Sequence, residues 1–413
     1  MNKLSHELAW RGLLHQTTFS APTDLDTKTR TVYLGIDPTA DSLHVGHLAS
    51  MMILRHLLDA GWKIVMLVGG GTGMIGDPSG KSDERNMLTL EEIDKNKKAI
   101  AAQMSALFDG KSFTMVDNFD WLNKVSLLEF LRDIGKHFGM SMLVQRDYIA
   151  QRIGEGGSGI SYTEFSYTLL QGYDYWHLFK HHGVTVQLGG SDQWGNMLSG
   201  VDLIRKKENA EAHIISGPIV INKATGKKFG KSEAGAVWLD PTKTSPFQFY
   251  QFWLNSDDAS VIDYLKYFTL LSEQEINALA EQTKQSPELR AAQKQLAYLM
   301  TSTVHGTDKA DSVVRITTSL FGADYSQMQA SDFEALSHEV PMQNISADTS
   351  LVDIVVGAQL ASSKTEARRF IQDGAVSVNG QKITTETLPV AILIHGYGIV
   401  KRGKNAISVI KVG

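Results

Sequence analysis

The feature that most constrains the fold of this chain is an alternation of two patterns between Thr31 and about Leu239. Short runs rich in β-branched residues, namely VYLGI, KIVMLVGG, VTVQLGG and AHIISGPIVI, alternate with longer helical patterns such as LHVGHLASMMILRHLLDAG. This alternation is typical of a parallel sheet with crossover helices. We therefore expect an α/β domain in this part of the chain.

The sequence pattern changes twice in the rest of the chain. Because 413 residues exceed the usual size of one compact core, two or three domains are expected. Amphipathic helices follow Thr244, one of them marked by the capping box Ser272 to Glu275. Residues 328–349 are polar and lack a sustained period, which favours a linker. The sequence thus predicts an α/β domain over 1–240, an α-helical domain over 241–327, a linker over 328–349 and a small α+β module over 350–413.

Composition excludes several classes of protein. The net charge of −5 argues against a globally basic nucleic-acid binder, so such binding would need a local basic patch. The absence of cysteine excludes disulfides and thiolate metal sites, and we expect no metal bound by the protein. No apolar run is long enough for a membrane span, and Met1 to Thr18 has no signal-peptide core. We expect a soluble cytoplasmic protein, although a mitochondrial matrix form without its presequence would look the same.

The segment Tyr33 to His47, which reads YLGIDPTADSLHVGH, runs from a short strand through a proline turn into a helix expected to begin near Leu43. His44 and His47 are three residues apart and therefore share one face of that helix. Amides at a helix start and imidazoles can stabilise developing phosphate charge, and Gly46 lets a nucleotide approach the backbone. The segment predicts a nucleotide site, with two ordinary surface histidines as the alternative.

A second basic segment, KFGKS from Lys228 to Ser232, lies about half the chain away. Lys228 and Lys231 on a loop can neutralise the pyrophosphate that departs when the α-phosphorus of a nucleoside triphosphate is attacked. Alone, the segment is equally compatible with a solvated basic loop. Together, the two segments favour nucleotidyl transfer.

The glycine-rich segment from Gly69 to Arg85 lacks the spacing of a Walker loop. Its small residues let the backbone crowd a ligand, while Asp77 offers a carboxylate and Lys81 and Arg85 offer two cations. We expect it to border the same site.

Polar side chains also follow one face of a helix expected from about Tyr162 to His182, which begins with the capping box Ser161 to Glu164. Tyr167, Gln171 and Asp174 lie at i, i+4 and i+7 and so share that face. Because amphipathic helices normally bury apolar groups, this face favours a polar ligand, with a merely solvated face as the alternative. Ligands also gather at strand ends. The next strand and its loop carry Gln187, Gly190, Asp192 and Gln193.

The last segment, from near Ser350, is basic: between Ser362 and Gly413 there are eight Lys or Arg and three Asp or Glu. Its pattern predicts a helix with exposed arginines, a turn at Asp373 and Gly374, a strand and a hairpin turn at Asn379 to Gly380. Such a patch fits RNA through phosphate contacts that weaken with salt, with a solubilising surface as the alternative. The candidate contacts are Lys364, Arg368, Arg369, Lys401, Arg402 and Lys404.

In this order, YLGIDPTADSLHVGH, GDPSGK, YTEFSYTLLQGYD, QLGGSDQWGN and KFGKS resemble the bacterial tyrosyl-tRNA synthetases, a family of class I aminoacyl-tRNA synthetases. HVGH and KFGKS are similar to the HIGH and KMSKS signatures of that class, with Val45 replacing Ile and Phe229 and Gly230 replacing Met and Ser. The resemblance runs from about Leu4 into the C-terminal module. It implies a Rossmann-like catalytic domain, an α-helical anticodon-binding domain, a terminal module similar to that of the fourth small-subunit ribosomal protein, and a homodimer.

The resemblance implies a site for L-tyrosine. Tyr33 and Asp174 would hydrogen-bond the phenol, and Asp77, Tyr167 and Gln171 would take the ammonium group. Such a site rejects phenylalanine because its buried polar groups would stay unpaired, a rejection for which this family is a standard example. The full set implied for tyrosine is Tyr33, Asp77, Asn118, Tyr167, Gln171, Asp174, Gln187 and Gln193.

The resemblance also implies a site for ATP, with Mg²⁺ carried mainly by the triphosphate. Thr39 and His44 would contact the transferring phosphates, and His47 and Ser50 the ribose region. Leu34 offers only an apolar surface where family members often have a side chain that reaches the ribose hydroxyl. The other residues implied are Asp37, Gly46, Gly190, Asp192 and Ser232 for ATP, and Lys81, Arg85, Lys228 and Lys231 for pyrophosphate.

The implied reaction has two steps. The carboxylate of tyrosine attacks the α-phosphate of ATP, which gives tyrosyl-adenylate, and the terminal ribose of tRNA(Tyr) then takes the tyrosyl group. Positioning and preset charges would supply catalysis without a protein nucleophile.

Three other functions are left open. A tryptophan-specific relative shares the fold, but an indole cannot satisfy Tyr33 and Asp174 in the same way. A small-molecule nucleotidyltransferase would have no need of the terminal module. A non-catalytic RNA chaperone or splicing factor on this scaffold is disfavoured by the intact histidines and lysines.

Overall fold

The computed structural model of the chain describes residues 3–78, 88–108, 110–223, 225–226, 229–232, 235–322, 324–403 and 406–413, without the side chains of residues 147, 148, 231 and 232. The chain divides into two compact units. Unit 1 comprises Met1–Thr244 and Asn255–Leu296, and unit 2 comprises Ser245–Leu254 and Ala297–Gly413. Within these ranges no helix combines the length and the apolar character that crossing a membrane requires.

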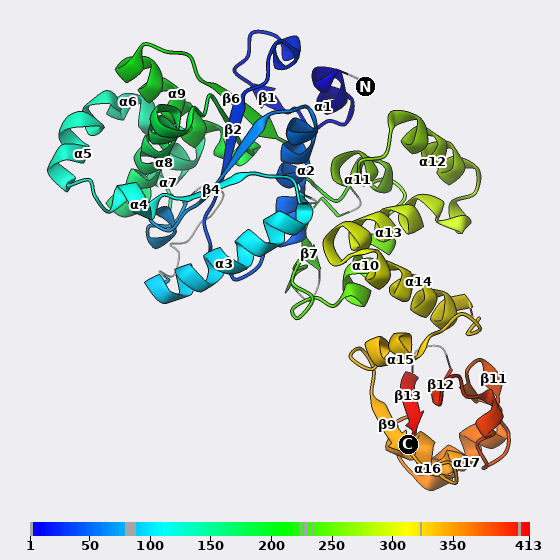
Figure 1. Cartoon of the computed structure of the whole chain (residues 1–413). Helices are drawn as coiled ribbons and strands as arrows, with labels where there is room; N and C mark the ends of the chain where they lie inside the picture. The colour runs from blue at the N-terminus through cyan, green and yellow to red at the C-terminus, as the bar shows by residue number, and fades with distance from the viewer. Residues whose placement is uncertain are drawn as a thin grey trace. The chain divides into compact units, whose positions relative to one another are not determined.

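Unit 1 is built on a six-stranded sheet with the order β1-β6-β5-β2-β3-β4 (Figure 1). All neighbouring strands are parallel except β1, which pairs antiparallel with β6. The parallel α/β architecture predicted from the alternating patterns is confirmed. Continuous apolar runs such as KIVMLV suit strands whose two faces are both covered. The strands are β1 (Gln16–Thr17), β2 (Thr31–Ile36), β3 (Lys63–Val68), β4 (Thr114–Asp117), β5 (Val186–Gly190) and β6 (His213–Gly217).

Helices cover the sheet. The helices α8 (Tyr162–His182) and α9 (Trp194–Glu208) pack together, and residues of both join Tyr33, Val65 and Leu67 in one core cluster. In Figure 1, α2 (Val45–Asp59) lies on the other side of the sheet. The approach of α8 to α9 requires Gly200, because a Cβ atom there would lie 2.6 Å from the side chain of Tyr175.

The bounds predicted for the helix from Tyr162 to His182, which is α8, are confirmed. Its N-cap, Ser161, accepts a hydrogen bond from the amide of Glu164, and it ends at Gly183 in the left-handed conformation (φ 64°) that glycine adopts without strain. The other helices of unit 1 are α1 (Leu4–Trp10), α3 (Leu90–Leu107), α4 (Phe119–Leu122), α5 (Leu127–Asp133), α6 (Met140–Leu143), α7 (Asp147–Ile153), α11 (Val261–Phe268) and α12 (Glu273–Gln285).

The N-terminal segment is tied to α11 by a buried arginine. Arg11, of which only 1 % is exposed, donates hydrogen bonds to the carbonyls of Lys266, Thr269 and Leu271 at 3.0, 2.9 and 2.5 Å. Its Nε also contacts Glu7 at 2.7 Å. The charge of Arg11 is therefore compensated inside the fold.

Unit 2 contains a five-stranded sheet with the order β11-β10-β12-β13-β9. Residues 328–349 differ from the linker that the sequence favoured, because they include α15 (Ala330–Leu336) and β9 (Met342–Ile345). Phe333 on α15 is fully buried and stacks on Tyr397, with ring centroids 5.2 Å apart, and β9 pairs in parallel with β13. The apolar anchors are too few and too widely spaced to produce a period.

The basic end of the chain has the local structure predicted from its pattern. Arg368 and Arg369 are exposed on α17, and Asn379 and Gly380 between β10 and β11 have the positive φ angles of 44° and 79° that a tight hairpin turn needs. The other elements of unit 2 are α10 (Pro246–Leu254), α14 (Thr307–Gly322), α16 (Leu351–Gly357), α17 (Lys364–Gln372), β10 (Val376–Val378), β11 (Gln381–Lys382), β12 (Tyr397–Arg402) and β13 (Ala406–Val412). The helix α13 (Ala291–His305) contributes to both units.

Candidate active site

Three buried polar atoms gather near the centre of the sheet in unit 1. The order of the strands changes direction between β2 and β5, which is where ligands of such sheets bind. Tyr33 and Gln187 are register partners on these strands and are only 1 % and 2 % exposed. The side-chain oxygens Oη of Tyr33, Oε1 of Gln187 and Oε1 of Gln171 are buried without a hydrogen-bond partner in the part of the chain that the structure describes. Since buried polar atoms are normally paired, these three indicate a polar ligand.

Asp174 on α8 lies beside them. Its carboxylate accepts hydrogen bonds from Nδ2 of Asn118 at 2.9 Å and from Nε1 of Trp121 at 2.7 Å. Burial raises the pKa of Asp174 to about 7, against the opposing effect of these two hydrogen bonds. Burial, and then the nearby Asp174, raise the pKa of Tyr33 well above its usual value. The site therefore pairs a neutral hydroxyl with a carboxyl that is balanced between its two protonation states near neutral pH.

A hydrogen-bond network leads from Asp174 to the turn after β2. Asn118 donates to Oγ1 of Thr72 at 2.8 Å, Thr72 donates to Oδ1 of Asp37 at 2.7 Å, and Tyr167 donates to Oδ2 of Asp37 at 2.9 Å. Asp37, which the resemblance assigns to the sugar of ATP, is thus also part of the wall near Tyr167. A Cβ atom on Gly69 would lie 2.1 Å from Oδ1 of Asp37, so the network needs a glycine there.

Tyr167 also lies near a second carboxylate, that of Asp77. Gln193 donates to Oδ2 of Asp77 at 2.6 Å, and Asn196 reaches Oε1 of Gln193 at 3.3 Å. Burial, followed by the charges of Asp37 and Asp77, raises the pKa of the Tyr167 hydroxyl well above its usual value. Several carboxylates close to one phenol create a negative potential that favours a cationic group of a ligand.

The two histidines lie at the start of α2, which begins at Val45, two residues later than predicted. His44 is the N-cap, and its Nδ1 accepts a hydrogen bond from the amide of Gly46 at 3.1 Å. The Nδ1 of His47 in turn accepts from the amide of His44 at 3.2 Å, and the ring centroids are 4.0 Å apart. Both imidazoles therefore stand at the positive end of the helix dipole, where anions bind.

The KFGKS segment contacts the start of α2. The amide of Val45 donates to the carbonyl of Val237 at 2.9 Å, and the amide of Val237 donates to the carbonyl of Gly230 at 3.3 Å. Gly230 has a φ of 105°, and a Cβ atom there would lie 3.1 Å from the amide nitrogen of Gly46. Two segments half a chain apart thus meet, as nucleotidyl transfer requires. The KFGKS segment ends in β7 (Lys231–Ser232), which pairs antiparallel with β8 (Gly235–Ala236).

The other residues predicted for the nucleotide lie around the same edge of the sheet. Thr39 is exposed after β2, and Ser50 is half-buried on α2, three residues beyond His47. Asp192 is exposed, and a Cβ atom on Gly190 would lie 2.5 Å from its Oδ1. Leu34 is buried in the sheet. Lys81, Arg85, Lys228 and Lys404 lie outside the described residues, as do the side chains of Lys231 and Ser232.

Three residues of the site are absent from the sequence prediction: Thr72, Trp121 and Asn196. Trp121 belongs to the four-residue helix α4, and no motif or periodicity marks it. Asn196 lies in the quoted segment SDQWGN and is only 1 % exposed, so that segment could have indicated it. Among the residues described, no group of three or more His, Asp or Glu side chains is arranged to hold a metal ion.

The five predicted RNA contacts that the structure describes all make contacts within unit 2. Lys364, Arg368 and Arg369 are paired with carboxylates at 2.7, 3.1 and 3.7 Å. Lys401 donates to the carbonyl of Leu320 at 2.6 Å, and burial lowers its pKa. The guanidinium of Arg402 lies 4.9 Å from the ring centroid of Phe370. Exposed ion pairs contribute little to stability, so an RNA phosphate can replace the carboxylates of the first three.

Comparison with known proteins gives matches over both parts of the chain. Residues 25–322 match the model of the class I tRNA synthetases (W and Y), and residues 332–410 match that of the tyrosine–tRNA ligase SYY-like C-terminal domain. A tyrosine–tRNA ligase of Staphylococcus carnosus is 43 % identical over 420 residues, which cover 99 % of each chain. One of Macrococcus caseolyticus is 45 % identical over 410 residues, 97 % of each chain. A crystal structure of a C-terminally truncated mitochondrial tyrosyl-tRNA synthetase from Aspergillus nidulans has a TM-score of 0.70 and 32 % identity, and covers 78 % of this chain and 95 % of that one.

Proposed function

Since the chain belongs to the class I tRNA synthetases of the tryptophan and tyrosine family, we infer that it is a tyrosine–tRNA ligase. It activates L-tyrosine with ATP to tyrosyl-adenylate and pyrophosphate, and then transfers the tyrosyl group to the 3′ end of tRNA. The observation that carries this inference is the buried hydroxyl of Tyr33, which lies beside the carboxyl of Asp174 and is unpaired within the described part of the chain.

This pair of groups favours tyrosine over its two aromatic competitors. A phenol both donates and accepts a hydrogen bond, so it can donate to Asp174 and accept from Tyr33. An indole N–H only donates, so it offers the hydroxyl of Tyr33 no acceptor, and a phenyl ring offers neither a donor to Asp174 nor an acceptor to Tyr33. Each buried group left unpaired costs about 1–3 kcal/mol.

The acidic wall suits the ammonium group of the same substrate. Asp77, Tyr167 and Gln171 are proposed to bind it, with Gln193 turned toward the carboxylate and Asn196 holding Gln193 in place. Gln187 and Asn118 support the pocket from β5 and from the network around Asp174.

Activation is proposed to occur at the start of α2. An oxygen of the tyrosine carboxylate attacks the α-phosphorus of Mg·ATP in line, and the bond to pyrophosphate breaks. The amides of α2, Thr39 and His44 stabilise the charge on the phosphates. His47 and Ser50 contact the ribose region, and Asp37, Gly190 and Asp192 lie around the sugar. The lysines of KFGKS, together with Lys81 and Arg85, would neutralise the departing pyrophosphate.

The finer statements on partners and location are proposals as well. We assign residues 241–327 to the anticodon of tRNA(Tyr) and the basic module over 350–413 to further tRNA contacts. A homodimer is supported by large apolar side chains that a single chain leaves exposed. The exposed apolar residues that support the homodimer include Leu127 (69 %), Leu128 (78 %), Met140 (60 %) and Tyr162 (71 %). A cytoplasmic location rests on the resemblance alone.

The test is amino-acid-dependent exchange of labelled pyrophosphate into ATP, run with each of the twenty amino acids. We expect exchange with tyrosine and none with phenylalanine or tryptophan. Exchange that depends on tryptophan, or no exchange with any amino acid, would overturn the assignment.

A further inference from the structure

A cavity of about 520 Å³ in unit 1 borders on Trp121 and lies among β4, α4 and the C-terminal part of α8. Its volume is in the range of small-molecule sites. The same indole belongs to the tyrosine site, because its Nε1 donates to Asp174 at 2.7 Å. One side chain therefore forms part of two sites. The lining includes Asp120, Trp121, Lys124, Tyr173, Trp176 and His177.

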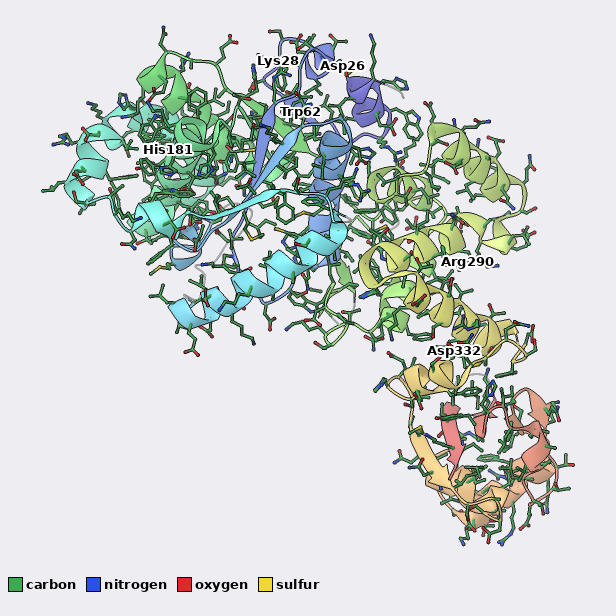
Figure 2. All side chains as sticks on the ribbon, viewed as in Figure 1. Asp26, Lys28, Trp62, His181, Arg290 and Asp332 are labelled. Carbon is green, nitrogen blue, oxygen red and sulfur yellow. The ribbon has the colours of Figure 1, made fainter. Side chains whose placement is uncertain are left out.

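The inner wall of the cavity consists of aromatic rings. The ring of His177 stacks on Trp121 with centroids 4.3 Å apart and an angle of 16°, and Tyr173 lies 5.3 Å from Trp176. His181, which Figure 2 labels, lies one turn further along α8, and its ring centroid is 4.4 Å from that of His177. Burial, followed by electrostatic interactions with His181, His182 and Lys124, lowers the pKa of His177 to about 4, so this ring is uncharged at neutral pH. Such a wall binds planar aromatic groups by stacking.

The lining carries one carboxylate, that of Asp120, and one ammonium group, that of Lys124, beside the imidazoles of His177, His181 and His182. Asp120 and Lys124 are exposed and lie about one helical turn apart, and no ion pair within the described ranges involves either of them. An unpaired carboxylate and an unpaired ammonium beside an aromatic wall complement a ligand with both charges. The ammonium group of the ligand would face Asp120, and its carboxylate would face Lys124.

We propose that this cavity binds a free aromatic amino acid, and that its occupancy tightens tyrosine binding by holding Trp121 against Asp174. A ligand stacked on this wall adds contacts that favour the conformation in which the indole donates to Asp174, and a tyrosine that needs this conformation then binds more tightly. The coupling rests on the function proposed above, whereas binding to the cavity does not.

The binding test uses the full chain and three probes that differ by one group each. L-Tryptophan carries both charges, tryptamine lacks the carboxylate and indole-3-propionate lacks the ammonium. Equilibrium dialysis should show that L-tryptophan binds more tightly than the other two, by about three-fold for each exposed ion pair. Lys124→Ala should remove the preference over tryptamine, and Asp120→Ala should remove the preference over indole-3-propionate.

Two further variants locate the probe. Lys98→Ala is the matched control, since Lys98 is an exposed cation on α3 that pairs with Asp94 outside the cavity lining. This variant should bind all three probes as the wild type does. Asp77→Ala alters the tyrosine site and should also leave tryptophan binding unchanged. No saturable binding, or binding that is lost in Asp77→Ala and retained in Lys124→Ala and Asp120→Ala, would overturn the proposal.

The coupling is measured as the KM for tyrosine in pyrophosphate exchange, with and without saturating L-tryptophan. We expect KM to fall by at least about two-fold. A rise in KM would mean that both amino acids compete for one site, and an unchanged KM would mean that Trp121 transmits nothing; either result overturns the coupling. If no amino acid supports exchange, the proposed function fails, and dialysis still decides whether the cavity binds.

Discussion

The two signature segments meet through glycines: a Cβ atom on Gly230 would lie 3.1 Å from the amide nitrogen of Gly46. Gly230 also has a φ of 105°, a conformation that other residues adopt only with strain. The close contact places the backbone of the KFGKS segment directly against the first turn of α2.

Gly230→Ala should therefore impair activation. The strain costs about 1–3 kcal/mol, which corresponds to adenylate formation slowed by roughly ten-fold or more if the segment shifts away from α2. Tyrosine affinity should not change. Gly226→Ala is the matched control, because its φ is also positive (67°) but nothing lies within 4 Å of the new Cβ. Stopped-flow adenylate formation measures both variants, and equal rates in the two would contradict this role of the contact.

The two functions of His44 can be separated by two substitutions. His44→Asn keeps a good N-cap, whereas His44→Ala removes it and should lower the free energy of unfolding by about 1 kcal/mol. Both variants lack the imidazole, so both should form adenylate more slowly, by about 3 kcal/mol at the barrier if it stabilises the phosphates. Urea unfolding and single-turnover kinetics check the two effects. A wild-type rate in His44→Asn would leave capping as the only role of this residue.

Tyrosine affinity should depend on pH through Asp174. Since burial raises the pKa of its carboxyl to about 7, the ionised form is scarce in acid and predominates in mild alkali. The ionised form is the stronger acceptor for a phenol, so affinity should rise by roughly ten-fold from about pH 6 to about pH 8. Equilibrium dialysis of labelled tyrosine across this range gives the profile. The rise should disappear in Asp174→Asn, and a flat profile in the wild type would be inconsistent with a titrating acceptor.

Tyr33→Phe removes a buried hydroxyl that has no hydrogen-bond partner among the residues described. The variant should be as stable as the wild type, or more stable by about 1 kcal/mol, since a desolvated polar group is lost. Its preference for tyrosine over phenylalanine should fall by about ten-fold, because the substrate phenol loses one of two partners. The ratio of kcat/KM values in pyrophosphate exchange measures this preference. An unchanged ratio would exclude Tyr33 from phenol recognition.

Arg11→Leu should destabilise unit 1 without acting on chemistry. It leaves one buried carbonyl, two partly buried carbonyls and Glu7 without their donor, and we expect a loss of about 3 kcal/mol or more in the free energy of unfolding. Arg132→Leu is the control, since Arg132 is 72 % exposed and should change stability little. Denaturant unfolding measures both. Similar midpoints for the two variants would show that the contacts of Arg11 contribute little.

The sequence predicted those elements whose signals are local. The capping box at Ser161 and the glycine after His182 determined the bounds of α8, and the alternation of patterns determined the parallel sheet. The start of α2 was misplaced by two residues because His44, an uncommon N-cap, uses its ring nitrogen where Ser or Asp would use an oxygen.

Features that depend on contacts between distant residues were not predictable in this way. Trp121 and Thr72 join the site only because α4 and the turn after β3 meet Asp174 and Asp37 in space. Residues 328–349 form ordered structure because the ring of Phe333 stacks on that of Tyr397, which is more than sixty residues away in the sequence. A single sequence does not reveal such pairs when neither residue belongs to a motif.

The continuity of α8 has a consequence for substrate choice. Tyr167 and Asp174 are seven residues apart on one unbroken helix, so their backbones are separated by about 10 Å along its axis. In the proposed site, where Tyr167 binds the ammonium group and Asp174 the phenol, this helix fixes the distance between the groups that hold the two ends of the amino acid. Single substitutions on α8 do not change this backbone separation. A chain that evolves toward a shorter or longer substrate must instead change the side chains of β2 and β5 that line the site.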